Sequence, residues 1–161
     1  MKSENIDQLL RHRMQSQAPI TIRPATADDC ATIYNFMCDL ERITLDNTAF
    51  RAVFRRNLID PCVRYRVAEQ EGQVVGFVSC HIQYLLHHTG KVGEIQELYV
   101  HPENRNQRIG HQLVAHLEDV ARRESLVNLE VTTNQRRTDT IRFYEQTGFV
   151  LSHRKLVKRL L

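Results

Sequence analysis

The chain alternates between stretches whose hydrophobic residues recur every three or four positions and stretches in which they recur every second position. The first spacing predicts amphipathic helices and the second predicts strands. Helices are expected at residues 30–40, 47–58, 109–121 and 138–147. Strands are expected at residues 21–23, 63–68, 74–84, 92–100 and 127–131, with a terminal strand or hairpin-like pair at 149–160. This order predicts an α/β sandwich around one sheet.

The strand that ends at Val100 does not keep its own alternation. Ile95 and Leu98 are three positions apart, whereas Leu98 and Val100 are two apart. A β-bulge near Gln96 or Glu97 would return these side chains to one face and would leave backbone groups unpaired. The alternative is a regular strand with one polar position turned inward. The pattern alone leaves both open.

Length and composition change this picture little. A chain of 161 residues, 42% hydrophobic and 25% charged, suits one compact domain at residues 20–161. Residues 1–19 are expected to be an appendage with a short helix that packs on the domain or on a second subunit, as in a homodimer. The chain has no apolar run of about 18 residues and no apolar leader, so we expect a cytoplasmic protein that does not bind membranes. A net charge of +3 is too small to indicate nucleic-acid binding.

Candidate chemistry begins where the irregular strand meets the next helix. A polar loop joins the two elements and carries Arg105 and Arg108. The first backbone N–H groups of a helix lack partners within the helix and carry about half a positive charge, so they bind phosphates well. This stretch therefore predicts a site for a phosphorylated cofactor.

Three short motifs in this half of the chain resemble those of the GNAT N-acetyltransferases. Residues 105–110 have the form R-x-x-G-x-G/A, residues 98–102 resemble L-x-V-x-P, and residues 142–149 resemble an FYxxxGF ending. The chain departs from the first motif at Arg108, which stands where glycine is usual. The resemblance implies a GNAT fold: a single mixed, mostly antiparallel sheet with splayed central strands and helices on both faces.

The substrate-side half also resembles one group within that superfamily, the aminoalkylphosphonate N-acetyltransferases. This second resemblance rests on residues 49–51, 57–58, 60–61, 64–65, 86–88, 93–98 and 133–134. Enzymes of that group transfer acetyl from acetyl-CoA to the amine of aminomethylphosphonate, 1-aminoethylphosphonate and similar small molecules. Two other hypotheses stay open: a GNAT enzyme for another small amine or a protein amine, and a non-catalytic CoA-binding module.

Acetyl transfer to an amine needs a group that removes a proton from the nucleophile. Glu97 and Glu94 lie on the irregular strand, and we favour Glu97 because it adjoins the suspected bulge. In a regular strand two residues three apart face opposite sides, and a bulge could change that. The plain alternative for either residue is a solvated or salt-bridged carboxylate.

Two further groups would complete the chemistry. A backbone N–H released at the bulge, at Leu98 or Tyr99, could stabilise the oxyanion of the tetrahedral intermediate. Tyr144 matches the usual general acid of the superfamily, which protonates the leaving thiolate. The alternative for Tyr144 is a tyrosine that packs on the core.

The resemblance also implies which residues hold CoA. The expected set continues from the strand into the helix: Leu98, Tyr99, Val100, Arg105, Asn106, Gln107, Arg108, Ile109, Gly110 and His111. Asn134 is expected near the pantetheine. The basic pair Arg136 and Arg137 is a better candidate for the 3′-phosphate than the basic clusters at residues 122–123 and 153–155, and Arg137 is the expected ligand.

A phosphonate needs cationic partners. Arg51 and Arg64 fall within the family-like stretches, and His87 and His88 lie in the loop before the irregular strand. Each of these alone is more often a surface charge than a ligand. The adjacent histidines also raise the possibility of a divalent metal that bridges the phosphonate, although no third ligand is evident from the spacing.

Overall fold

The fold is one mixed sheet, seen in a computed structural model that describes residues 18–153, 155–158 and 160. The strand order is β1-β2-β3-β4-β5. The strands are β1 (Thr21–Pro24), β2 (Val63–Gln70), β3 (Gln73–Leu85), β4 (Gly90–Val100) and β5 (Leu126–Val131). The first four pair antiparallel, and β5 pairs parallel to β4.

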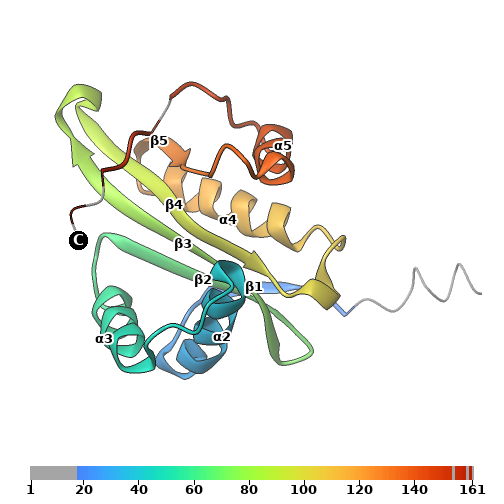
Figure 1. Ribbon diagram of the computed structural model, residues 1–161. Helices are drawn as coiled ribbons and strands as arrows, with labels where there is room; N and C mark the ends of the chain where they lie inside the picture. The colour runs from blue at the N-terminus through green and yellow to red at the C-terminus, as the bar shows by residue number, and fades with distance from the viewer. Residues whose placement is uncertain (1–17, 154, 159, 161) are drawn as a thin grey trace, which may run out of the picture.

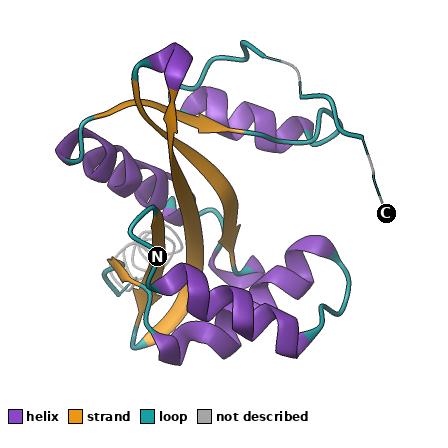
Figure 2. Ribbon diagram, turned by 90° about the vertical axis from the view of Figure 1, so that its left-hand side faces the viewer, coloured by secondary structure: helices purple, strands orange, loops and turns teal. Residues whose placement is uncertain are grey.

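Helices cover both faces of this sheet. The helices α2 (Cys30–Glu41) and α3 (Asn47–Leu58) lie on one face. The helices α4 (Ile109–Arg123) and α5 (Thr138–Gln146) lie on the other, as Figure 1 shows. In the turned view of Figure 2 the long strands pass between the two helical layers. The predicted architecture, a mixed and mostly antiparallel sheet with helices on both faces, is confirmed.

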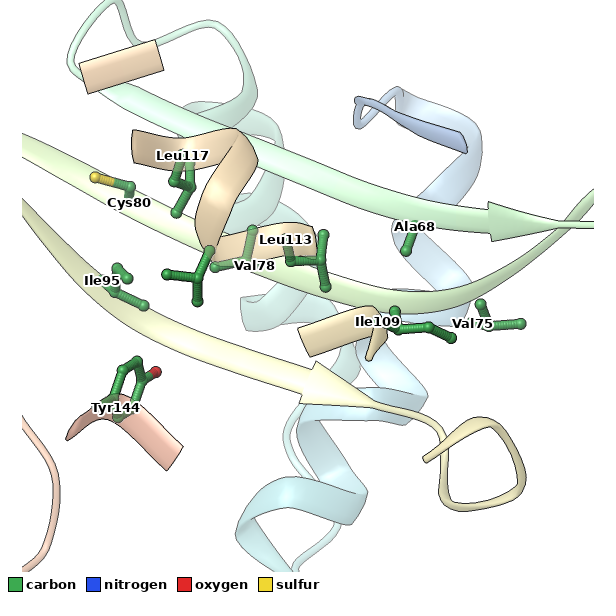
Figure 3. Packing of buried hydrophobic residues seen from close by; sticks show 10 residues of the cluster. Ala68, Val75, Val78, Cys80, Ile95, Ile109, Leu113, Leu117 and Tyr144 are labelled. Carbon is green, nitrogen blue, oxygen red and sulfur yellow. The ribbon is translucent and has the colours of Figure 1, made fainter. Parts of the chain in front are cut away.

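Side chains alternate along the strands, and each face therefore has its own core. On β3, Val78 and Cys80 point to the α4 face, where they pack with Leu113 and Leu117 (Figure 3). Phe77, which directly precedes Val78 on the strand, packs on the α2–α3 face. This alternation assigns every strand residue near the site to one face or the other.

The expected terminal strand is wrong for the described part of residues 149–160. The chain after α5 runs back past β5 as a coil (Figure 1) and adds no strand to the sheet. Its apolar side chains are largely exposed, at Val150, Leu151, Leu156, Val157 and Leu160. A strand is stabilised by a ladder partner and by a buried face, and this segment has neither.

Two other expectations concern the ends of the chain and the membrane. Most of the N-terminal appendage, residues 1–17, lies outside the described residues. None of the helices in the described ranges is long and apolar enough to span a membrane.

Two smaller differences from the expected elements lie before the irregular strand. Strand β4 begins at Gly90, two residues earlier than expected, and a 3-10 turn, η2 (Leu86–His88), forms within the loop before it.

Candidate active site

A bulge interrupts the pairing of β3 and β4 at the place where the sequence loses its alternation. Val78 lies opposite Leu98, and Cys80 lies opposite Ile95. Two residues of β4, Gln96 and Glu97, therefore oppose one residue of β3. The predicted bulge is confirmed, and the regular strand with an inward polar position is excluded.

The bulge brings the two candidate bases to the same face. Ile95 points to the α4 core, so its neighbour Glu94 points to the α2–α3 face, opposite His81. Beyond the bulge Glu97 points to the α2–α3 face as well. A regular strand would have placed these two carboxylates on opposite sides.

The two carboxylates have different partners. Glu94 accepts a hydrogen bond from Thr132 Oγ1 at 2.9 Å and lies 3.9 Å from Lys155 Nζ. Glu97 accepts a hydrogen bond from the hydroxyl of Ser79. Glu94 is thus held at the β5 side of β4, whereas Glu97 is held at the bulge itself.

Ser79 is a functional candidate that the sequence interpretation missed. Its side chain is fully buried, and its hydroxyl donates to the Glu97 carboxylate while accepting from the Glu97 backbone N–H at 3.1 Å. A bulge leaves a backbone group without a ladder partner, and an unpaired buried group is costly. Ser79 supplies that partner and fixes the carboxylate in the same contact. The available signal was a small polar residue within a largely apolar strand, across from the broken alternation.

A cavity of about 620 Å³ opens between helices α2 and α3 and the sheet, and we call it the α2–α3 cavity. Glu97, Gln96, His81 and Gln83 supply polar groups from β3 and β4. Its apolar wall consists of Ile33, Met37, Leu45, Phe50, Val53, Phe54, Tyr65 and Phe77. Glu41 and Asn57 complete the lining, and the Asn57 amide donates to the Tyr65 hydroxyl at 2.7 Å. Apart from Glu97, sequence reasoning singled out none of these residues for the site.

The other side of β4 is open beyond the bulge. Strand β5 pairs with β4 only as far as Ile95. The His101 N–H donates to the Val75 carbonyl at 2.9 Å, toward β3. Because N–H directions alternate along a strand, the Tyr99 N–H also faces β3, and the Leu98 N–H faces the open side. Of the two expected oxyanion donors, Leu98 is therefore the one directed into the gap between β4 and β5.

The loop of residues 105–108, which we call the arginine loop, leads from this gap into α4. Asn106 and Arg108 have positive φ angles of 64° and 60°. Helix α4 then begins at Ile109, and the side chain of its N-cap residue, Arg108, makes no capping hydrogen bond. The unusual arginine thus occupies a left-handed backbone conformation, which is the conformation that favours glycine. The first N–H groups of α4 therefore receive no hydrogen bond from this side chain.

Gly110 ties the start of α4 to α5. A Cβ atom at this position would lie 3.3 Å from the ring of Phe143, so the glycine permits a close approach of the two helices. The His111 ring packs edge-on against Phe143 with centroids 4.9 Å apart. Between β5 and α5, the Asn134 carbonyl accepts from the Arg137 N–H at 2.8 Å, which closes a tight turn.

Tyr144, next to Phe143 on α5, is 6% exposed and packs in the α4-face core (Figure 3). Burial raises the pKa of its phenol to about 12, because the phenolate would lose its hydration. No hydrogen bond joins its hydroxyl to another residue in the described ranges. The side chain therefore combines core packing with a protonated hydroxyl at neutral pH.

The expected phosphonate ligands lie apart from the α2–α3 cavity. Arg64 alternates with Tyr65 on β2, so it faces α4, where its Nε and Nη2 donate to Glu124 at 2.7 and 2.6 Å. Arg51 Nε donates to Asn47 Oδ1 at 2.8 Å on the exposed side of α3. Neither arginine lines the cavity.

The two adjacent histidines lie beside β5. His88 Nε2 is 3.7 Å from Glu130 Oε1, and the rings of His87 and His88 lie 4.4 Å apart. Neither ring lines the α2–α3 cavity. Within the part of the chain that the structure describes, no group of three or more His, Cys, Asp or Glu residues could hold a metal ion.

Comparisons with known proteins agree with this geometry. The model of the acetyltransferase (GNAT) family matches residues 30–149. An aminoalkylphosphonate N-acetyltransferase from Salmonella typhimurium strain LT2 is 43% identical over 152 residues, which cover 94% of this chain and 99% of the relative.

Solved structures show the same fold. A transcriptional regulator from Bacillus halodurans C-125 superposes with a TM-score of 0.81 at 27% identity, over 88% of this chain and 100% of the other. An aminoglycoside N-acetyltransferase in complex with CoA superposes with a TM-score of 0.79 at 17% identity, over 90% of this chain and 97% of the other.

Proposed function

We propose that this chain, which belongs to the GNAT acetyltransferase family and is an acetyl-CoA-dependent N-acetyltransferase, acetylates the primary amine of small aminoalkylphosphonates. The observation that carries the choice of acceptor is the 43% identity to an aminoalkylphosphonate N-acetyltransferase over nearly the full length of both chains. The match covers 94% of this chain, so it spans the elements around the α2–α3 cavity as well as the three motifs. In this proposal the acceptor-binding residues come from those elements.

In this proposal the cofactor lies on the open side of β4. The first N–H groups of α4 and the side chains of Arg105 and Arg108 bind the pyrophosphate. The remaining motif residues, from Asn106 to His111, shape that loop and helix start, and Asn134 approaches the pantetheine. Arg137, at the N-terminal end of α5, meets the 3′-phosphate. The thioester then reaches the bulge through the gap between β4 and β5.

The acceptor amine approaches from the α2–α3 cavity. Its nitrogen attacks the thioester carbon, and Glu97, directly or through a water, takes the proton that the nitrogen releases. The Leu98 N–H donates to the carbonyl oxygen as it becomes an oxyanion. Ser79 is a positioning residue, because it holds the Glu97 carboxylate and the Glu97 N–H together. Glu94, on the same face and three residues earlier, is the second candidate base.

Collapse of the intermediate breaks the C–S bond and releases a thiolate, which takes its proton from Tyr144. The pKa of about 12 for Tyr144 exceeds the value of about 8.5 for an ordinary thiol. Complete transfer from the phenol is therefore uphill, and it must accompany C–S cleavage rather than precede it. Until that moment Tyr144 acts as a hydrogen-bond donor to sulfur.

A different acceptor is favoured by one observation. Among the residues that the structure describes, the α2–α3 cavity is lined by Glu41 and Glu97 and by neither lysine nor arginine. A phosphonate dianion gains little from such a lining, so a small amine without a phosphonate is the second candidate acceptor.

The cytoplasmic location and the homodimer expected from the sequence are kept as predictions.

A thiol-release assay tests the acceptor. Acetyl-CoA is supplied with aminomethylphosphonate, 1-aminoethylphosphonate, lysine, a polyamine and an aminoglycoside, each with and without a divalent metal. We expect the aminoalkylphosphonates to have the highest kcat/KM. Equal or better turnover of lysine, the polyamine or the aminoglycoside would overturn the choice of acceptor while leaving the acetyltransferase activity.

A further inference from the structure

The α2–α3 cavity has two chemically distinct parts. Most of its polar groups lie at the sheet, where Glu97, Gln96 and His81 stand around the bulge, and the helix side contributes only Glu41 and Asn57 among the described lining residues. Its apolar wall, defined above, rises from α2, α3 and two strands, and rings supply much of it. Phe50, Phe54 and Tyr65 form a chain of stacked rings, with centroids 6.2 and 5.5 Å apart.

The position of the bulge orients any acceptor in this cavity. The acceptor nitrogen must reach the thioester at β4, beside Glu97. The carbon that bears the nitrogen then lies just above the sheet, and a substituent on that carbon extends toward α2 and α3. Such a substituent meets the side chains of Met37, Val53 and Phe54.

The apolar wall is a poor place for an anion. A phosphonate lying among these side chains would lose its hydration, and no described lining residue is a lysine or arginine that could replace it. Glu41 and Glu97 would also repel it. The wall therefore suits the uncharged part of the acceptor, and the phosphonate must remain outside the wall.

We infer that the apolar wall binds a hydrophobic substituent on the amine-bearing carbon of the acceptor. This inference rests on the proposed acetylation of aminoalkylphosphonates. The inference narrows the acceptors to 1-aminoalkylphosphonates that carry a branched alkyl or aryl group on the amine-bearing carbon. The cavity volume of about 620 Å³ is large for an acceptor as small as aminomethylphosphonate. A benzyl group would also pack against the stacked rings of the wall.

A graded series of acceptors tests the inference. The substituent grows from hydrogen to methyl, isobutyl and benzyl in the phosphonates, and the same four amines are assayed with hydrogen in place of the phosphonate. We expect kcat/KM to rise by about fourfold from hydrogen to methyl, the first methylene-sized group buried, and by at least about tenfold from the first member to the last.

The pattern of results separates the two proposals. If aminomethylphosphonate is the best acceptor and the benzyl compound is poor, the hydrophobic substituent is wrong and the phosphonate stands. If kcat/KM rises with size and the amines without phosphonate do as well, the phosphonate is wrong and the hydrophobic substituent stands. If none of the eight compounds is acetylated, both the phosphonate and the hydrophobic substituent are wrong.

A variant of the wall supplies a second test with a matched control. Val53 lines the cavity, is 56% exposed and can be replaced without opening the core. Val53→Asn should lower kcat/KM for the benzyl phosphonate about fivefold and change that for aminomethylphosphonate less than about twofold. Ile59→Asn, at the end of α3 and outside the cavity lining, should leave the ratio of the two unchanged. An equal loss on both acceptors in Val53→Asn would contradict the inference.

Discussion

The arginine loop and the α2–α3 cavity lie on either side of the β4 bulge, and they are built in different ways. The loop is one short run of sequence at the start of α4, and in our proposal its backbone N–H groups recognise the cofactor by main-chain geometry. The cavity takes side chains from two helices and three strands, between Ile33 and Glu97. A site made of backbone needs a fixed local conformation, whereas a site made of side chains needs a particular packing of distant segments.

This difference separates cofactor binding from acceptor chemistry. Substitutions at the bulge should change turnover and leave CoA binding intact, and substitutions in the arginine loop should do the reverse. Each prediction below tests that division at one residue.

The largest effect is expected for Glu97→Gln. The amide cannot take the proton from the amine, so kcat should fall by roughly 10²- to 10³-fold, within the usual range for losing a general base. Affinity for CoA, measured by calorimetry, should stay within about twofold of the parent, since Glu97 faces the α2–α3 cavity. Glu94→Gln is the matched control on the same face. A larger loss in Glu94→Gln than in Glu97→Gln would transfer the role of base to Glu94.

Tyr144→Phe should lower kcat by about 10- to 100-fold, which lies at or below the lower end of typical general-acid contributions. The ring remains in the core, so thermal stability and CoA affinity should hardly change. Because burial raises the pKa of Tyr144 to about 12, its hydroxyl stays protonated below about pH 10 in the folded protein. An alkaline fall in parent activity below that pH must come from another group. Undiminished turnover in Tyr144→Phe would remove the proposed acid.

Ser79→Ala tests whether the bulge itself is held by a side chain. The substitution leaves the Glu97 N–H and carboxylate without their shared partner, which should cost about 1–3 kcal/mol of stability. It should also lower kcat about tenfold, with the KM for acetyl-CoA unchanged. Ser79→Thr restores the hydroxyl and should recover most of kcat if positioning is the cause. A variant that loses stability but keeps kcat would make Ser79 purely structural.

The contrast between the arginine loop and the α2–α3 cavity also explains which features could be predicted from the sequence. Motif residues such as Arg105 and Gly110 belong to one local conformation, so their pattern predicted the fold, which is confirmed, and the cofactor side, which stays a prediction. The broken alternation at Ile95 and Leu98 also indicated the bulge, because a period of two is a local property. The sequence did not show that Arg64 pairs with Glu124 across to α4, since that depends on which face each strand residue takes.

The cavity wall was missed for a related reason. Met37 and Phe54 have ordinary helical spacing, and such a pattern predicts a packed core just as well as a cavity. Only the separation of α2 and α3 from the sheet distinguishes the two. The unpaired chain after α5 is a third case, because apolar residues with strand-like spacing form a strand only where an edge and a core are available.

The smallest expected effect is also the sharpest test of the arginine loop as a backbone site. Arg108→Gly relieves a left-handed φ of 60°, which costs a non-glycine residue about 1–2 kcal/mol, partly offset by the larger chain entropy of glycine. We therefore expect a rise in unfolding free energy of up to about 1 kcal/mol in chemical denaturation. If Arg108 also pairs with the pyrophosphate, the KM for acetyl-CoA should rise severalfold while kcat is kept.

Arg42→Gly is the matched control for this change. Arg42 ends α2 with a φ of 57° and lies outside the loop, so it shares the backbone strain without the phosphate. Both variants should gain stability, and only Arg108→Gly should weaken binding of acetyl-CoA. If Arg108→Gly binds acetyl-CoA as tightly as the parent, the cofactor is held by the backbone of the loop and by Arg105. The departure from glycine at this position would then cost stability without strengthening the binding of CoA.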